Sequence, residues 1–160
     1  MGSSPTKAAS NMYCKCRLEA AKYNDKLNSR EGAAEMLGLS SSTLASYELG
    51  LTKVVPVESI ALMADVYNAP ELKPWYCTNV CPLGEDMPKI ELEELDRITV
   101  KTLATLRHIS EVKDDLLDIT ADGVISPDEK PKLDNIIKTL KQVTEVAQFL
   151  RIWAEKNIKE

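Results

Sequence analysis

Aromatic residues are scarce in this 160-residue chain, at 5% with a single Phe, and His108 is the only histidine. No apolar run approaches the roughly 18–20 residues that a membrane-spanning helix needs, so we expect no membrane span. The first ten residues, MGSSPTKAAS, lack the apolar stretch of a signal peptide and are expected to be a flexible tail, which favours a cytoplasmic protein. No serine sits in a nucleophile-elbow setting, so the sequence offers no nucleophile, base and orienting group, and we expect neither enzyme activity nor a cofactor.

Globular composition accompanies these absences. Hydrophobic residues make up 44% and charged residues 28%, which is enough to build a core. Six Gly and eight Pro are mostly gathered between runs of helical periodicity, which predicts an all-α fold. Four of the prolines lie between Pro70 and Pro88, and because proline cannot continue a helix interior, residues 81–88 predict a domain boundary. The predicted domains are residues 11–84 and residues 85–160.

Charge is unevenly divided between these two parts. Residues 1–84 contain eight Lys or Arg and eight Asp or Glu, for a net charge of zero, whereas residues 85–160 contain twelve against seventeen, for −5. Neither part is a basic domain of the kind that nucleic-acid-binding proteins often have. Any contact with DNA is therefore expected from a locally placed face.

Short helices are predicted before the boundary, over residues 11–24, 30–37, 41–49 and 57–67, with a further turn over 71–76. Cys14, Leu18 and Ala21 are expected to face inward, and residues 24–28 are read as a polar link. Ser29 and Ser40 are good N-caps because a hydroxyl can accept from a free first-turn amide. Gly38 suits the left-handed conformation that often ends a helix.

The segment SREGAAEMLGLSSSTLASYELG, residues 29–50, resembles the helix-turn-helix of the phage repressor and Cro family. Ten positions match the family pattern in type and spacing: Ser29, Ala34, Leu37, Gly38, Leu39, Ser40, Leu44, Glu48, Gly50 and Pro56. One position departs from it, since Arg30 stands where the family usually has Gln. The resemblance implies a repressor-like helix-turn-helix bundle over residues 11–84, double-stranded DNA as partner, and a transcriptional regulator of phage or mobile-element type. It also implies an interior ion pair between Arg17 and Glu48.

Candidate DNA-contacting residues follow from this pattern, because short hydroxyl side chains at a helix N-terminus can reach bases or phosphates in the major groove. They are Ser41, Ser42, Thr43 and Ser46, with Lys53 as a further candidate. The helix over residues 30–37 is expected to offer its N-terminal amides and Arg30 to a phosphate. Two other interpretations stay open. In the first, the protein is only a small helical bundle and the hydroxyls cap its helices. In the second, the helix-turn-helix fold binds a protein, as in an antitoxin or an anti-CRISPR-like inhibitor. The second gains support from the absence of Arg in residues 41–49, since Arg-to-guanine is the commonest specific contact.

Four cysteines allow three interpretations. Cys14 and Cys16 lie about 200° apart on a helix, so they cannot both face one metal unless the helix begins later. Cys77 and Cys81 lie in the proline-rich stretch. Buried or unpaired thiols are the favoured interpretation, ahead of zinc and of a disulfide, which a cytoplasmic setting disfavours. No metal ligand is therefore assigned.

Two long helical patterns fill the C-terminal part, over residues 89–118 and 127–158. The expected apolar stripe of the first is Ile90, Leu95, Ile98, Leu103 or Thr102, Leu106, Ile109, Val112 and Leu116. That of the second is Leu133, Ile136, Ile137, Leu140, Val143, Ala147, Leu150 and Ala154, beside Trp153. The two helices are expected to form a long antiparallel hairpin. A lone hairpin has little core, so we expect a homodimer through residues 85–160, forming a four-helix bundle. The alternative is that the hairpin packs onto its own N-terminal domain.

The link between the two patterns, residues 118–129, partly matches a calcium-binding loop, with Asp118, Asp122 and Glu129 at positions 1, 5 and 12. Thr120 stands at position 3, where an acid or Asn is expected. A turn at Asp122-Gly123 and a capping box beginning at Ser126 explain the same residues without a metal, and this interpretation is favoured.

Overall fold

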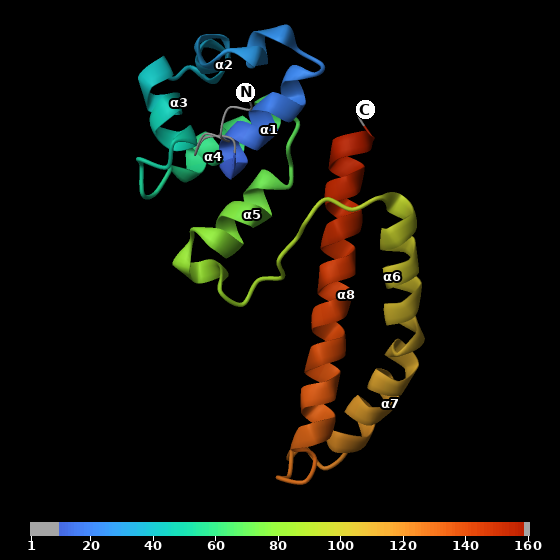
Figure 1. The fold of residues 1–160 in the computed structure, drawn as a ribbon. Helices are drawn as coiled ribbons and strands as arrows, with labels where there is room; N and C mark the ends of the chain where they lie inside the picture. The colour runs from blue at the N-terminus through green and yellow to red at the C-terminus, as the bar shows by residue number, and fades with distance from the viewer. Residues whose placement is uncertain (1–9, 159–160) are drawn as a thin grey trace, which may run out of the picture. The chain divides into compact units, whose positions relative to one another are not determined.

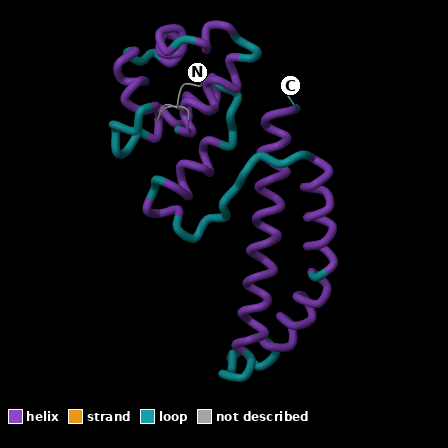
Figure 2. Tube along the Cα trace, viewed as in Figure 1, coloured by secondary structure: helices purple, strands orange, loops and turns teal. Residues whose placement is uncertain are grey.

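The computed structural model describes residues 10–158, so nearly all of the expected N-terminal tail lies outside the described residues. The described part is helical and contains no strand, which confirms the predicted all-α fold class (Figures 1 and 2). The chain divides into two compact units, Met1–Met87 and Pro88–Glu160, three residues beyond the predicted boundary. Among the described helices, none is both long and apolar enough to cross a membrane.

Unit 1 consists of short helices. In order they are α1 (Met12–Ala21), the 3₁₀ turn η2 (Asp25–Asn28), α2 (Arg30–Leu37), α3 (Ser41–Glu48), α4 (Val57–Val66), α5 (Leu72–Asn79) and the 3₁₀ turn η3 (Pro82–Gly84). The predicted bounds of α2 match, and those of α3 and α4 differ by one residue at the C-terminal end. The first helix is shorter than predicted at both ends, because Asn11 is its N-cap and accepts from the Tyr13 amide at 2.8 Å. The predicted turn over residues 71–76 is the longer helix α5.

Local capping fixes the α2–α3 pair. The Ser29 hydroxyl accepts from the Gly32 amide at 3.0 Å, and the Ser40 hydroxyl accepts from the Thr43 amide at 3.1 Å. Between the helices, Gly38 has φ 62°, a left-handed conformation that a side chain would strain. The sequence therefore sets both helix starts and the turn between them.

The core of unit 1 differs from expectation on α1 and η2. Leu18, expected to face inward, is 45% exposed, because the buried position beside it is taken by Arg17, which is 4% exposed. Residues 24–28, expected to be a polar link, contain Leu27, which is 1% exposed and belongs to the core. On α2 and α3, Ala33 and Leu44 are fully buried, and the small alanine allows close helix packing.

Unit 2 is a helical hairpin made of α6 (Leu95–Arg107), α7 (Ile109–Ile119) and α8 (Lys130–Asn157). The single helix predicted over 89–118 is wrong in two respects. It begins at Leu95, since residues 89–94 are non-helical and bring Ile90 into a cluster with Ile98, Phe149 and Ile152. It is also interrupted at His108.

That interruption lies between two apolar clusters. The first holds Ile98 and Phe149 among its members, and the second holds Val112, Ile119 and Ile136. Between them the buried residues are Val146 and two polar residues, Thr105 and Thr139. The middle of the hairpin therefore has less apolar burial than either end.

The seam of α8 also departs from the predicted stripe. Its buried residues are Ile136, Thr139, Val146, Phe149 and Ile152, and Leu133, Val143 and Trp153 are half-buried. Exposed instead are Ile137, Leu140, Ala147 and Leu150 from the predicted stripe. Both sets have helical spacing, so periodicity alone did not identify the stripe that faces the partner helix.

Candidate nucleic-acid interface

Helix α3 carries the candidate hydroxyl side chains on its outer side. Its inner side is anchored by Leu44, which is 0% exposed, Tyr47 and Glu48, whereas Ser42 is exposed and Ser41, Thr43 and Ser46 are half-buried. Within unit 1 the outer side of α3 is therefore open to solvent.

The hydroxyls bond to one another and to the backbone. The Ser40 hydroxyl lies 2.9 Å from that of Ser42 and 2.7 Å from that of Thr43. The Ser46 hydroxyl donates to the Ser42 carbonyl at 3.0 Å, and the Ser41 hydroxyl donates to a Glu31 carboxylate oxygen at 3.5 Å. The predicted residues thus share one surface, where they also serve as the caps that the alternative interpretation expects.

Beneath this surface, Arg17 and Glu48 meet as the resemblance implies. The Arg17 Nε lies 2.6 Å from Glu48 Oε1 and its Nη2 lies 3.0 Å from Oε2. Arg17 Nη1 also donates to the carbonyls of Leu27 and Asn28, at 2.8 and 3.2 Å. The pair therefore ties α1 to both α3 and η2. Burial opposes ionisation of the Glu48 carboxyl, but the hydrogen bonds from its arginine partners outweigh burial and hold its pKa below the usual range.

A second arginine shares the same carboxylate. Arg30, the first residue of α2, places its Nε 2.7 Å from Glu48 Oε2, and its side chain is 33% exposed. Sequence reasoning assigned Arg30 to a phosphate and did not anticipate this ion pair. The available signal was the departure from the family pattern, a cation where Gln is usual, on the helix that packs against α3.

Charge around the α3 surface is mixed. Lys53 is exposed in the loop after α3, and the described residues give it no ion pair. The α2 side of the surface carries two exposed acids, Glu31 and Glu35. Arg30, at the start of α2, meets Glu48 at the C-terminal end of α3, whereas Ser41, Ser42 and Thr43 lie at its N-terminal end. Lys53 lies on the loop that follows.

None of the four cysteines forms a disulfide in the structure. Cys14 and Cys16 are buried, whereas Cys77 and Cys81 are half-buried. Burial raises the pKa of the Cys14 thiol, and the neighbouring Glu48 carboxylate adds to the effect. Nowhere in residues 10–158 do three or more His, Cys, Asp or Glu side chains gather as a metal would require. Cys16 belongs to the apolar core of unit 1, and the Cys14 sulfur accepts from Arg17 Nη2 at 3.7 Å.

The acids that match calcium-loop positions, at the link between α7 and α8, form hydrogen bonds with neighbouring protein groups. Asp118 Oδ2 accepts from Lys132 Nζ at 2.6 Å, Asp122 Oδ1 accepts from the Val124 amide, and Glu129 Oε2 accepts from the Ser126 hydroxyl at 2.6 Å. The expected capping box is modified, since α8 begins at Lys130 and not directly after Ser126. The turn interpretation describes this loop, and its acids do not converge on one point.

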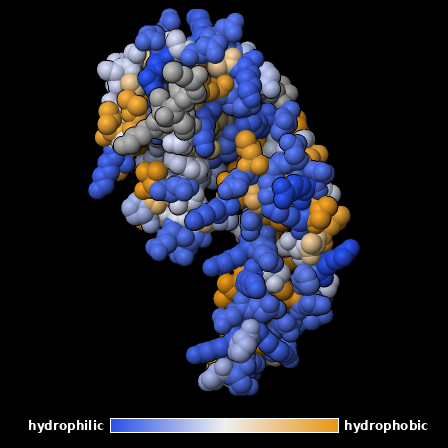
Figure 3. Space-filling model, viewed as in Figure 1, coloured by the Kyte–Doolittle hydropathy of each residue, from blue (hydrophilic) through white to orange (hydrophobic). Residues whose placement is uncertain are grey.

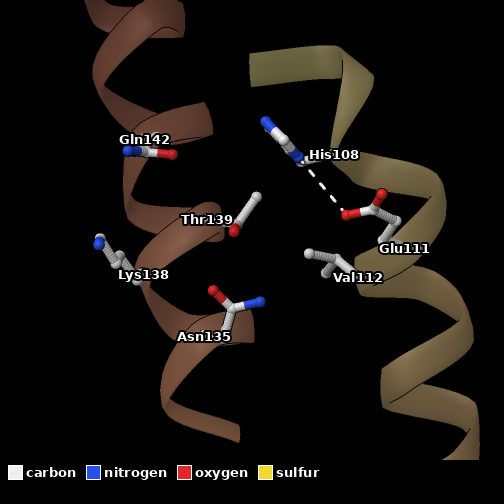
Figure 4. Close-up of a pocket in the computed structure, with 7 residues that line it drawn as sticks. All are labelled: His108, Glu111, Val112, Asn135, Lys138, Thr139 and Gln142. Carbon is white, nitrogen blue, oxygen red and sulfur yellow. Dashed lines mark ion pairs between the residues drawn. The ribbon is translucent and has the colours of Figure 1, made fainter. Parts of the chain in front are cut away.

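Unit 2 has a polar pocket beside the break at His108 (Figure 4). Its lining residues, besides Val112, are His108, Glu111, Asn135, Lys138, Thr139 and Gln142. His108 Nδ1 lies 3.5 Å from Glu111 Oε2, and both side chains are largely exposed. In the figure His108 and Glu111 point from their helix toward α8, while Asn135 and Thr139 point back.

Comparison of the chain with protein-family models, curated proteins and solved structures gives no match, and function is therefore inferred from the residues and contacts described above.

Proposed function

We propose that this protein is a sequence-specific DNA-binding transcriptional regulator that reads double-stranded DNA with unit 1. The observation that carries the proposal is the α2–α3 pair, which has capped starts at Ser29 and Ser40, a left-handed Gly38 between the helices, and a solvent-open outer side on α3. In helix-turn-helix proteins the second helix of such a pair enters the major groove, and the N-terminus of the first can meet the backbone.

The proposal extends to a homodimer through unit 2, because the hairpin has two unlike faces. Most residues that line its pocket come one position before a buried or half-buried residue of the seam between the arms, as His108 and Glu111 do on one arm and Asn135 and Lys138 on the other. Residues one position before the seam therefore lie on one face of the hairpin, from both arms. Residues one position after the seam must then share the opposite face.

That opposite face carries several exposed apolar side chains. On α8 it carries Ile137, Leu140 and Leu150, which are 44–45% exposed, and on α6 it carries Leu103 and Leu106, at 57% and 52%. Figure 3 shows hydrophobic side chains at the surface of the unit among hydrophilic ones. A second copy presents the same face, so two hairpins would bury both as a four-helix bundle with two-fold symmetry. Such symmetry also suits DNA half-sites one turn apart.

A second candidate function, binding a protein partner through the α3 surface, is favoured by one specific observation. Four apolar side chains beside α3 are exposed, from Leu49 at 39% to Leu51 at 73%, with Val54 and Val57 between these values. The acids of α2 would oppose a phosphate backbone, whereas an apolar patch with mixed charge suits a protein. An inhibitor or antitoxin would use the same fold in this way.

Selection of bound sequences from random duplex DNA tests the DNA-binding proposal. We expect recovery of a defined site, and we expect Ser42→Ala and Thr43→Ala to change the preferred bases at one or two positions, because these side chains lie at the start of α3. The matched control is Ser10→Ala, which lies before α1 and should leave the site unchanged. Failure of the wild-type protein to bind any duplex, even at low salt, would refute the proposal and favour the protein-binding alternative.

A further inference from the structure

We infer that Glu48 is a positioning residue that holds Arg30 so that the outer nitrogens of its guanidinium, Nη1 and Nη2, bind a backbone phosphate of DNA. This inference rests on the proposed function and names the contact that unit 1 uses for the backbone. It starts from the sharing of one buried carboxylate by two arginines.

Arg17 by itself fixes the position of the Glu48 carboxylate. Glu48 is 0% exposed, and Arg17 grips it through two nitrogens while donating also to the carbonyls of Leu27 and Asn28. Arg17 is itself 4% exposed. Glu48 therefore presents Oε2 from a fixed place in the interior.

Arg30 meets that fixed oxygen through Nε alone, at 2.7 Å. Within the part of the chain that the structure describes, its Nη1 and Nη2 have no hydrogen-bond partner. Because the guanidinium is planar and rigid, a bond at Nε fixes the direction of the two outer nitrogens. One third of the side chain is exposed, at the first residue of α2.

Within the trio of Arg17, Arg30 and Glu48, the charges agree with this arrangement. Two guanidinium groups face one carboxylate, which leaves one positive charge in excess, and the exposed member of the trio is Arg30. A guanidinium edge binds phosphate oxygens with two parallel hydrogen bonds. The chemical class of ligand is therefore a phosphate diester of the DNA backbone, bound without regard to base sequence.

Arg30 could instead contribute only its positive charge, without being held in place by Glu48. The Arg30→Lys variant distinguishes these two roles. If Arg30 were simply an exposed cation, lysine would replace it in binding. If Glu48 positions a fork, the compact lysine ammonium is drawn onto Glu48 and no second donor pair is left for the phosphate.

The experiment measures duplex binding against salt concentration for wild type, Arg30→Lys and Arg30→Gln. We expect both variants to bind all duplexes about tenfold more weakly and to lower the slope of log K against log salt by about 1, the signature of one lost phosphate contact. Lys73→Gln is the matched control, since Lys73 is an exposed cation of α5 that pairs with Asp65, and it should change neither quantity. If the melting temperatures of both Arg30 variants equal that of wild type, the experiment measures binding and not folding.

Wild-type slope and affinity for Arg30→Lys would overturn the inference while leaving the DNA-binding proposal intact. If wild type binds no duplex, the proposed function fails, and titration with inorganic phosphate then decides the inference by itself. In NMR spectra of wild type, the signals of the Arg30 side chain and of the α2 amides should shift saturably with phosphate. The α2 amide signals of Arg30→Lys should not shift in this way. Identical responses of the two proteins to phosphate would refute the positioned contact.

Discussion

Replacing Glu48 with Leu is expected to destabilise the protein by about 3–5 kcal/mol, because it leaves the buried Arg17 guanidinium without its carboxylate. Arg17→Met should cost less, since Arg30 still pairs with Glu48. The double variant Arg17→Met/Glu48→Leu should be milder than Glu48→Leu, because no unpaired buried charge remains and Arg30 reaches solvent. Urea unfolding of the four proteins gives each free energy, and Lys22→Ala, in an exposed pair with Glu19, is the control with little expected effect.

The pH dependence of stability supplies an independent check on this pair. The pKa of Glu48 is lowered in the folded protein, so its ionised form contributes stability that is fully present above its ordinary pKa of 4.5. That contribution is lost as pH falls through the lower folded-state pKa. Acid should therefore destabilise wild type more steeply than the double variant. Small, independent effects of the two single substitutions would show that the pair is not a buried ion pair in solution.

Leu140→Asp is expected to convert a dimer of wild type into a monomer and to lower affinity for an operator by orders of magnitude. The charge would lie on the apolar face of the hairpin, where the second copy is proposed to pack, and separate monomers would lose the joint binding of two half-sites about 34 Å apart. Leu140 is 45% exposed, so the monomer should tolerate the aspartate. Val143→Asp is less suitable because Val143 is half-buried in the seam and its change would damage the hairpin itself.

Analytical ultracentrifugation measures this outcome directly. Wild type is expected at about twice the chain mass of 17.8 kDa, and Leu140→Asp at the chain mass. Lys138→Asp is the matched control, because Lys138 is an exposed α8 residue on the face that carries the pocket, and it should leave the dimer intact. A wild-type mass of one chain at micromolar concentration, unchanged by operator DNA, would contradict the dimer.

Local sequence determined the helices of the α2–α3 pair, because each of its boundaries rests on the backbone conformation or hydrogen bond of a single residue. Ser29, Gly38 and Ser40 act within three residues of where they stand, so their effect can be read without the rest of the fold. The same holds for the fold class, since helical periodicity and the placing of proline are properties of short segments.

Tertiary structure decided which side of each helix faces inward and which charges meet. Arg17 and not Leu18 faces inward on α1, where it pairs with the buried carboxylate of Glu48, 31 residues away in sequence. On α8, the stripes containing Leu140 and Phe149 have equal periodicity, and only contact with α6 and α7 selected the second. Arg30 shows the same limit at the candidate site. Its type and position indicated a phosphate contact. Its bond to Glu48 depends on how α2 packs against α3, and no local sequence pattern determines that packing.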